Sequence, residues 1–385
     1  MKLFVGLLLV GMQLATTQSF ASELFETKAK QAFLMDADTG TILFEKDSDK
    51  PVPPASLSKL MTMEMVFHSI RTGEHSVDDM IHISENAWRT GGAGSGGSTM
   101  FAKLDSDIKL NDLIHAVIIQ SANDACIAIA EAFSGSEENF AKAMTARATQ
   151  IGMTRSVFKN STGLPAEGQK VTMRDLATLA RHIWKQYPDF YPIYGQREFE
   201  WNKIKQRNRN PLLAMNIGAD GMKTGFTEES GYAMVGSSSR EGRRLFMALS
   251  GMASERERAE EGRKMLEWGI RAFEKRDLFQ EGEVIGVASV FGGSKSSVPL
   301  VAKGRLSIFV PVANADQLKA RVVYQGPVAA PIELGAEVGL LKVFIGDRLF
   351  QELPVYAGEA VEVGNLRQRA ESAAYELMTG WLRAL

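Results

Sequence analysis

The sequence predicts a mixed α and β domain, followed by a small all-β domain and a C-terminal amphipathic helix. Strand-like runs lie near both ends of the first part and enclose several helical segments. After about Asp277 the runs become short and strand-like, at roughly ten-residue spacing. The last segment carries a continuous apolar stripe at helical spacing. A length of 385 residues, with 45% hydrophobic and 23% charged residues, is typical of a globular protein with two domains.

Composition excludes several classes of partner and site. The 44 basic and 46 acidic residues nearly cancel, so a net charge of −2 gives no electrostatic reason to expect a nucleic acid partner. The single cysteine, Cys126, excludes an internal disulfide and a cysteine-based zinc or iron–sulfur cluster. Because Cys126 lies in an apolar run, we expect a buried packing residue and not a reactive thiol. We expect no metal and no other cofactor.

Residues 1–21 have the layout of a secretory signal peptide. A positive start at Lys2 is followed by an apolar run, Leu3–Leu14, which is too short to span a membrane as a stable helix. Ser19 and Ala21 then place small residues where a signal peptidase cuts. We therefore expect the segment to be removed and the mature protein to be exported. No later apolar run is long enough for a transmembrane helix.

The elements of the first part follow from hydrophobic periodicity and from turn residues. A hairpin turn at Gly40 joins the first two strands. A helix begins near Ser56, where apolar residues start to recur at three- and four-residue spacing after two prolines. The glycine-rich segment 91–97 is expected to be a mobile loop without an element. Helices are predicted at 56–70, 109–119, 123–133, 137–150, 172–186 and 254–275, and strands at 31–36, 41–46, 221–227, 231–238 and 244–250.

The second part is predicted to be all-β, and the tail to be helical. In the tail, 367–385, alanine, leucine, methionine and tryptophan residues share one face of the helix. Such a stripe either lies flat at a lipid interface or packs on its own domain, and its place at the end of an exported chain favours the membrane. The strands of the second part are predicted at 284–290, 297–302, 306–310, 320–324, 339–345 and 348–354.

A serine and a lysine are the candidate catalytic pair. Serine needs a nearby base to act as a nucleophile, and none of the five histidines lies in a triad motif or at metal-ligand spacing. Lysine is an alternative base if burial or a nearby cation lowers its pKa. The pattern Ser-x-x-Lys occurs three times, and only Ser56 and Lys59 lie one turn apart on an apolar-periodic helix. Ser106/Lys109 and Ser156/Lys159 have polar surroundings.

Two further motifs follow in order along the chain. Ser121-Ala122-Asn123 joins two predicted helices, where polar side chains can face a cleft. Lys223-Thr224-Gly225 lies within a predicted strand. Ordered Ser-x-x-Lys, Ser-x-Asn and Lys-Thr-Gly together form a strong signal for enzymes that interact with penicillin.

With these blocks the chain resembles the low-molecular-mass penicillin-binding proteins, the serine-type D-alanyl-D-alanine carboxypeptidases of peptidase family S11. The resemblance runs from about residue 27 to the C-terminus, and it is carried by the segments around the three motifs and by the segment 208–210. It implies a transpeptidase/β-lactamase-like domain at 27–277, with an antiparallel sheet built from both ends of the segment and a helical cluster between them. It further implies a β-sandwich-like domain at 282–366 and a membrane-anchor helix at 367–385, on the periplasmic face of the bacterial inner membrane.

The resemblance also implies roles for the catalytic residues. Ser56 would attack the carbonyl between the two terminal D-alanines of a peptidoglycan stem peptide. Lys59, kept neutral by burial and by the cation of Lys223, would take its proton. Ser121 would pass a proton to the leaving D-alanine. Backbone N–H groups of Ser56 and Phe226 would form the oxyanion hole.

Other residues would bind the substrate. Asn123 would contact the peptide amide, and Lys223 and Thr224, with Gly225 completing the motif, would hold the terminal carboxylate. Arg258 matches the family's carboxylate-binding arginine. β-Lactams would acylate the same serine as substrate mimics.

Two departures from the family pattern and three alternatives remain. Ser58 stands where much of the family has threonine, and Phe226 stands where many members carry histidine. A β-lactamase is one alternative, although no Glu-x-x-x-Asn loop is evident before Lys223. A DD-transpeptidase and a catalytically silent wall-binding scaffold are the others.

Overall fold

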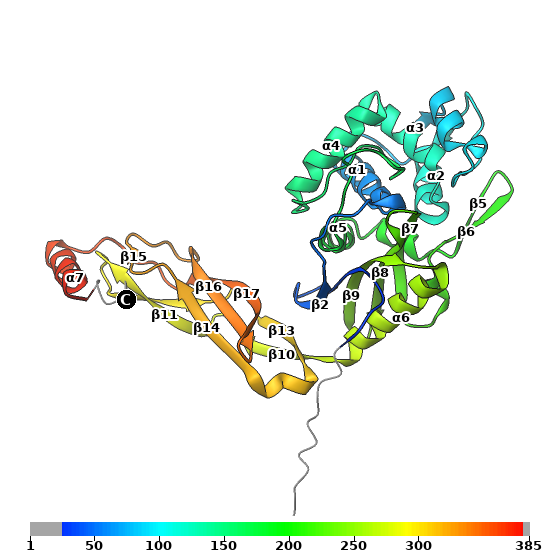
Figure 1. The fold of residues 1–385 in the computed structure, drawn as a ribbon. Coiled ribbons are helices and arrows are strands. Elements are labelled where there is room, and N and C mark those ends of the chain that lie inside the picture. The colour runs from blue at the N-terminus through cyan, green and yellow to red at the C-terminus, as the bar shows by residue number, and fades with distance from the viewer. Residues whose placement is uncertain (1–24, 380–385) are drawn as a thin grey trace, which may run out of the picture.

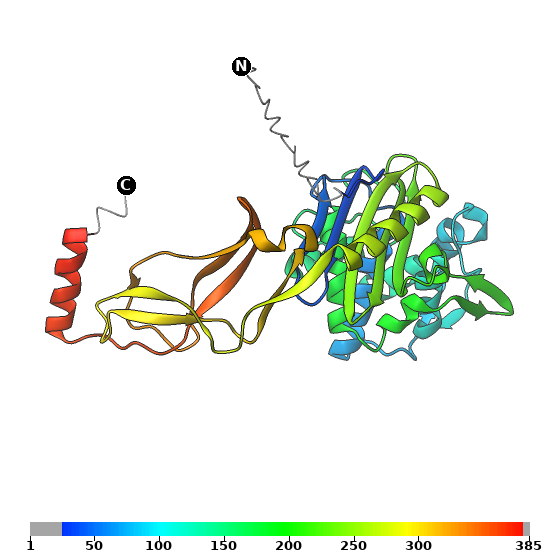
Figure 2. The ribbon, with the colours of Figure 1, turned by 90° about the horizontal axis from the view of Figure 1, so that it is seen from below.

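The computed structural model describes residues 25–379 and has two parts joined end to end, one mixed α and β and one all-β (Figure 1). The C-terminal helix α7 (Leu366–Thr379) lies at the end of the second part that is remote from the first (Figure 2). The predicted order of an α+β domain, an all-β domain and a helix is therefore confirmed. The predicted signal peptide, residues 1–21, lies outside the described residues, as do 380–385.

The first part is built on a five-stranded antiparallel sheet. Its strand order is β2-β1-β9-β8-β7, so the N-terminal hairpin joins three strands from much later in the chain. The hairpin turns at Gly40, whose φ of +73° is the left-handed conformation that glycine adopts without strain. β7 forms one edge of the sheet. The strands are β1 (Gln31–Asp36), β2 (Ile42–Lys46), β7 (Ala219–Thr227), β8 (Gly231–Arg240) and β9 (Arg243–Met252).

Helices cover both faces of this sheet. Successive side chains of a strand point to opposite faces, so Phe33 packs into a core with α1 and α5, while Leu34 packs into a second core with α6. β1 is consequently buried along its whole length. Cys126 is fully buried in α3, as predicted. The helices are α1 (Lys59–Thr72), α2 (Leu110–His115), α3 (Asn123–Ser134), α4 (Glu137–Gln150), α5 (Met173–Gln186) and α6 (Glu255–Arg271).

Three predicted element boundaries were wrong. The α-helix expected from Ser56 begins at Lys59, after a 3₁₀ turn η1 (Ala55–Ser58). The helix expected over 254–275 ends at Arg271, because the residues that follow pair as a strand with a segment more than thirty positions later. The helix expected over 109–119 is α2 followed by a π turn, η4 (Ala116–Gln120).

The glycine-rich segment and two short hairpins also differ from expectation. Within 91–97, where a loop without elements was predicted, the structure has the end of a π turn η2 (Ala87–Gly91) and a 3₁₀ turn η3 (Ala93–Ser95). Two strand pairs were not predicted, since each strand has only three or four residues. They are β3 (Met80–His82) with β4 (Asp107–Lys109), and β5 (Glu198–Trp201) with β6 (Ile204–Arg207).

The second part is all-β, and its predicted strands are confirmed in order. A six-stranded sheet has the order β14-β16-β17-β12-β11-β15, and β10 and β13 form a separate pair next to the first part. Their apolar residues enclose a core of their own. The strands are β10 (Phe273–Phe279), β11 (Val284–Phe291), β12 (Ser297–Val301), β13 (Leu306–Pro311), β14 (Leu318–Tyr324), β15 (Val328–Ala329), β16 (Glu337–Ile345) and β17 (Arg348–Ala357). A last 3₁₀ turn is η7 (Val312–Gln317).

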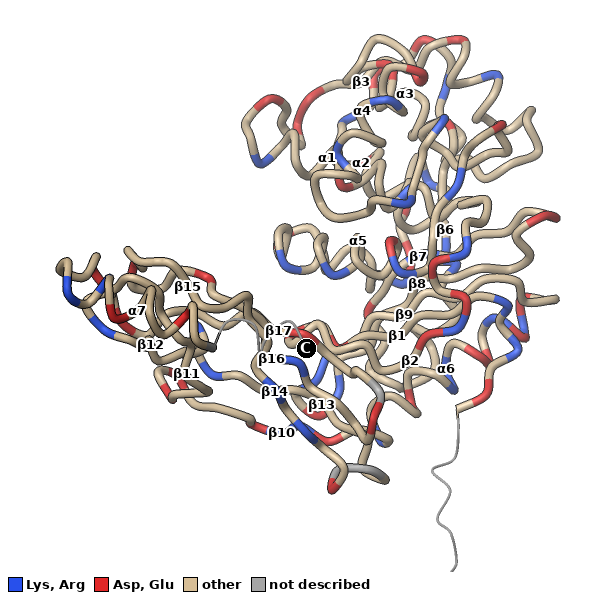
Figure 3. The backbone as a smooth tube through the Cα atoms, turned by 60° about the vertical axis from the view of Figure 1, so that its left-hand side comes forward, with Lys and Arg blue, Asp and Glu red and all other residues tan. Residues whose placement is uncertain are grey.

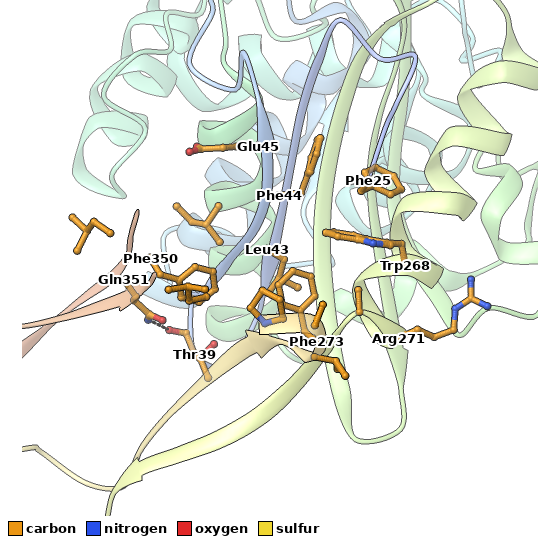
Figure 4. Close-up of a pocket in the computed structure, with 18 of the residues that line it drawn as sticks. Phe25, Thr39, Leu43, Phe44, Glu45, Trp268, Arg271, Phe273, Phe350 and Gln351 are labelled. Carbon is orange, nitrogen blue, oxygen red and sulfur yellow. Dashed lines mark hydrogen bonds between the residues drawn. The ribbon is translucent and has the colours of Figure 1, made fainter. Parts of the chain in front are cut away.

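The two parts meet through specific contacts beside an apolar groove. Arg243 donates to the carbonyl of Phe273 at 3.0 Å, and its guanidinium lies 4.0 Å from the ring centroid of Phe309. Thr41 donates to the side-chain oxygen of Gln351 at 2.9 Å. The groove beside these contacts has a volume of about 1300 Å³, and its aromatic lining includes Trp268 (Figure 4).

Acidic and basic residues are intermixed over both parts of the chain (Figure 3). Among the described helices, none combines the length and the apolar character needed to cross a membrane.

Candidate active site

Ser56 and Lys59 lie at the start of α1, with the lysine amine against the serine hydroxyl. Lys59 Nζ is 3.1 Å from Ser56 Oγ. Ser56 is half-buried in the 3₁₀ turn η1, and Lys59 is 1% exposed in the first turn of α1. The turn begins at Ala55, which has a φ of +49°, in the left-handed region. The predicted one-turn spacing therefore brings the amine to the hydroxyl, although the turn is partly 3₁₀.

The surroundings of Lys59 favour an uncharged amine. Its Nζ donates to the carbonyl oxygen of Thr162 at 2.8 Å. The pKa of Lys59 is lowered to about 8, mainly by burial and also by the positive charge of Arg209, against the raising effects of Cys126 and Glu137. At pH 7 about a tenth of such amines are neutral. A neutral amine at this distance can accept the serine proton.

Lys223 lies on β7, behind the same site. Its amine is buried and donates to the carbonyl of Thr224 at 3.1 Å. Burial, and then repulsion by Lys59 and Arg209, lower the pKa of Lys223 well below its usual value. The expected effect of the Lys223 cation on Lys59 stays a prediction, and the two amines do interact, because the charge of Lys59 lowers the pKa of Lys223. Burial has the largest effect on the pKa of Lys59, and Arg209 is the cation that follows.

The turn of Ser56 is tightly packed between two glycines. A Cβ on Gly225 would lie 3.2 Å from the Ser56 nitrogen, so β7 runs directly beside Ser56. A Cβ on Gly163 would lie 1.7 Å from the Ala55 carbonyl oxygen, and Gly163 has a φ of +81°. No side chain fits at Gly163, and a side chain at Gly225 would require its neighbours in the turn to shift by a few tenths of an ångström. The position of Ser56 is therefore fixed from both sides.

The Ser-x-Asn motif lies where the π turn η4 ends and α3 begins. Ser121 has a φ of +67°, and its hydroxyl is buried without a hydrogen-bond partner among the described residues. A buried hydroxyl without a partner costs stability, and Ser121 lines the pocket, where a ligand can supply the missing hydrogen bond. The Asn123 backbone donates to the Ser98 carbonyl at 2.8 Å, and its side-chain nitrogen fills the space beside Gly97.

These segments enclose a pocket of about 520 Å³. Lys59, Lys223 and Asn123 are buried beside the pocket and do not line it. The side chain of Phe226 is 50% exposed at the pocket, and its ring lies 4.3 Å from that of Tyr232. Of the predicted site residues, six line the pocket: Ser56, Ser121, Thr224, Gly225, Phe226 and Arg258.

Sequence reasoning missed several lining residues. Arg209 donates to the hydroxyl of Ser98 at 2.7 Å, which ties the loop after β6 to the glycine-rich segment. Arg258 lies over the ring of Tyr232, 5.6 Å from its centroid, and pairs with Glu255 at 3.9 Å. The only sequence signal for Arg209 was its place in the segment 208–210. The other four missed lining residues have no local pattern, because the packing of distant segments brings them to the site: Ser98, Pro211, Tyr232 and Glu255.

The rejected candidates have structural partners of their own. Lys109 is exposed and pairs with Asp78 at 3.0 Å, as its polar surroundings predicted. Ser156 donates to the carboxylate of Asp175 at 2.7 Å. None of the five histidines, all of which are described, lines the pocket. Within residues 25–379, no group of three or more metal-ligating side chains is arranged to hold an ion.

Comparisons with known proteins match both parts of the chain. Residues 15–253 match the family model of the D-alanyl-D-alanine carboxypeptidases, and residues 273–363 match the C-terminal domain of penicillin-binding protein 5. The D-alanyl-D-alanine carboxypeptidase DacC of Escherichia coli is 36% identical over 87% of this chain and 85% of its own length. DacF of Bacillus subtilis is 30% identical over 93% and 94%.

Solved structures agree with these matches. Penicillin-binding protein 5 from Haemophilus influenzae is 33% identical and has a TM-score of 0.77 over 88% of this chain and 98% of that one. Penicillin-binding protein D2 from Listeria monocytogenes, solved in an ampicillin-bound form, is 27% identical with a TM-score of 0.58, over 64% of this chain and 99% of that one. The chain thus belongs to the D-alanyl-D-alanine carboxypeptidase family.

Proposed function

We propose that this chain removes the terminal D-alanine from peptidoglycan stem peptides that end in D-Ala-D-Ala, through an acyl-enzyme on Ser56. The observation that carries the proposal is the 3.1 Å contact between Ser56 Oγ and the buried amine of Lys59. The amine lies next to a pocket whose wall carries Thr224 and Arg258. A nucleophile with its base and a carboxylate-binding wall are what hydrolysis at a chain end requires.

In the first step Ser56 Oγ attacks the carbonyl carbon between the two D-alanines, and its proton passes to Lys59 Nζ. Backbone N–H groups of Ser56 and Phe226 stabilise the negative charge on the carbonyl oxygen. The carbon–nitrogen bond then breaks, and the leaving D-alanine nitrogen takes up a proton through Ser121. Water attacks the resulting ester, which releases the shortened peptide and restores the serine hydroxyl.

The substrate carboxylate is expected to give the two lysines different protonation states, with Lys223 charged and Lys59 neutral. Thr224 and Arg258 in the pocket wall, with Lys223 buried beside them, hold the carboxylate, and its negative charge favours the ammonium form of Lys223. A charged Lys223 then opposes protonation of Lys59, because the charge of each lysine disfavours that of the other. Asn123 holds the peptide amide. Substrate binding would thereby prepare Lys59 as the base.

A digest of diacetyl-L-Lys-D-Ala-D-Ala, followed by mass spectrometry, tests this function. We expect release of one D-alanine per peptide and, in a parallel sample with penicillin, a covalent adduct on the protein. Rapid turnover of penicillin with no D-alanine release would instead identify a β-lactamase. Transfer of the peptide to an added amine would identify a transpeptidase, and no reaction in either sample would leave a non-catalytic wall-binding role.

We further propose that the protein is exported after removal of residues 1–21 and is anchored peripherally to the periplasmic face of the inner membrane by 367–385. Support for the anchor comes from α7, where Leu366 and Leu377 are 79% and 84% exposed. Apolar side chains presented on an amphipathic helix bind at a lipid interface, and nearby arginines such as Arg367 suit anionic headgroups.

Deleting 367–385 should move the protein from the membrane fraction to the soluble fraction while penicillin labelling is retained. Leu377→Glu should weaken membrane binding for the same reason, since it places a charge on the apolar face. Leu377→Met is the matched control and should leave fractionation unchanged. Unchanged membrane binding after the deletion would contradict the anchor.

A further inference from the structure

The segment 160–163 lies outside all predicted motifs and forms the wall behind Lys59. The carbonyl oxygen of Thr162 accepts a hydrogen bond from Lys59 Nζ at 2.8 Å. Gly163 packs so closely on Ala55 that no side chain fits between them. The segment thus contacts both the catalytic amine and the turn that carries Ser56. Any shift of Thr162 would change the direction in which the amine points.

Two side chains clamp this segment through Ser161. Thr62, one turn after Lys59 on α1, donates to the Ser161 carbonyl at 2.6 Å. Glu137, in the first turn of α4, accepts the Ser161 N–H at 3.1 Å and the Ser161 O–H at 2.5 Å. Ser161 is fully buried, and these contacts use its N–H, its hydroxyl and its carbonyl. Glu137 therefore fixes the residue next to the carbonyl that Lys59 contacts.

The orientation of the amine matters because a neutral amine has one lone pair. To act as a base, Lys59 must point that lone pair at Ser56 Oγ, 3.1 Å away. An N–H donated to the Thr162 carbonyl leaves the lone pair free for this purpose. We infer that Glu137 is a positioning residue for the reaction, holding Ser161 so that the Thr162 carbonyl aims the Lys59 amine at Ser56. The inference rests on the proposed function.

Glu137 also carries a charge that reaches Lys59. The charged and titratable groups facing the amine are Cys126 and Asp124 from α3, Glu137 from α4, Arg209 from the loop after β6, and Lys223 from β7. Burial raises the pKa of Cys126 to about 12, so that thiol is neutral at ordinary pH. The negative charge of Glu137 raises the pKa of Lys59, so its removal should lower that pKa.

Variants of Glu137 and Ser161 separate these two effects. The measurement is the second-order rate of acylation by a fluorescent penicillin, followed from about pH 6 to about pH 10, the range in which Lys59 titrates. Glu137→Gln keeps an acceptor oxygen but loses the charge. We therefore expect a near-normal maximal rate at high pH, the plateau of the pH–rate profile. The rise in rate at low pH, the acid limb of the profile, should move to lower pH. Glu137→Ala loses both, so the limb moves and the plateau also falls, by about 10- to 100-fold.

Ser161→Ala keeps the charge of Glu137 and loses only the hydroxyl contact, so the plateau should fall several-fold with the acid limb unmoved. Glu138→Gln is the matched control, because Glu138 is the next residue and pairs only with exposed Lys142 among the interactions of the described chain. It should behave like the wild type in both respects.

If Glu137 had only a structural role, its replacement would lower the melting temperature without moving the acid limb of the pH–rate profile. The profile of Glu137→Gln therefore tests the inference even if Glu137→Ala folds poorly. An unmoved limb in Glu137→Gln, or a normal plateau in folded Glu137→Ala, would overturn it. Failure of the wild type to acylate at any pH would instead overturn the proposed function.

Discussion

Replacing Ser56 by alanine is expected to abolish both D-alanine release and covalent labelling by penicillin. In the proposed mechanism the hydroxyl oxygen forms the ester, and no other described serine combines a lysine amine at 3.1 Å with a place in the pocket wall. Loss of the nucleophile from a serine hydrolase lowers kcat by about 10⁶-fold, so residual turnover should fall below detection. Intact-mass spectrometry after incubation with penicillin measures the adduct directly.

The structure offers two matched controls for this variant. Ser58→Ala removes a buried hydroxyl two residues along the same turn, and that hydroxyl has no hydrogen-bond partner among the described residues. Ser106→Ala removes the serine of another Ser-x-x-Lys pair, whose hydroxyl donates to the Lys103 carbonyl. Both should keep the adduct. An adduct retained in Ser56→Ala would show that a different residue is the nucleophile.

The parts of the site that could be predicted are those encoded by short spacing. The three-residue separation of Ser56 and Lys59 places both on one face whether the turn is α or 3₁₀. Thr224 and Gly225 were predictable because a strand keeps its neighbours in a line along one edge of the sheet. Local geometry therefore sufficed for the residues within each motif.

Contacts between segments could not be predicted in the same way. Thr162 reaches Lys59 because a loop far along the chain folds against α1, and only its backbone carbonyl is used. A backbone contact places no demand on residue type, so the sequence carries no trace of it. Ser161 and Glu137 are polar residues in polar stretches, and their contact depends on how α4 packs.

The end of α6 shows how pairing overrides local pattern. Residues 272–275 continue a helical pattern, yet Phe273 begins β10 and pairs with Pro311 on β13. The backbone hydrogen bonds of a strand pair, and the packing of Phe309 against Arg243, stabilise the extended form. Such long-range competition is not visible in a short window of sequence. The boundary between the two parts of the chain depends on it.

Lys59→Met should leave the fold intact and lower the acylation rate by about 10²- to 10⁴-fold, the usual contribution of a general base. Methionine keeps most of the side-chain volume in this buried position, so the loss reports on the amine. In the wild type the rate should rise with pH through about 8, because the neutral amine is the reactive form. Lys109→Met, which removes an exposed lysine paired with Asp78, is the control and should keep the wild-type profile.

Lys59→Met should also change the pH dependence of the free energy of unfolding. The pKa of Lys59 is about 8 in the folded chain and 10.5 in the unfolded chain, so between these values the unfolded state binds more protons. Wild-type stability should therefore gain up to about 3 kcal/mol from this group as pH rises across that window. Lys59→Met should lack the gain, measured as the difference between urea unfolding curves of the two proteins at each pH. An identical pH dependence in both, together with wild-type acylation by the variant, would mean that the Lys59 amine is not the base.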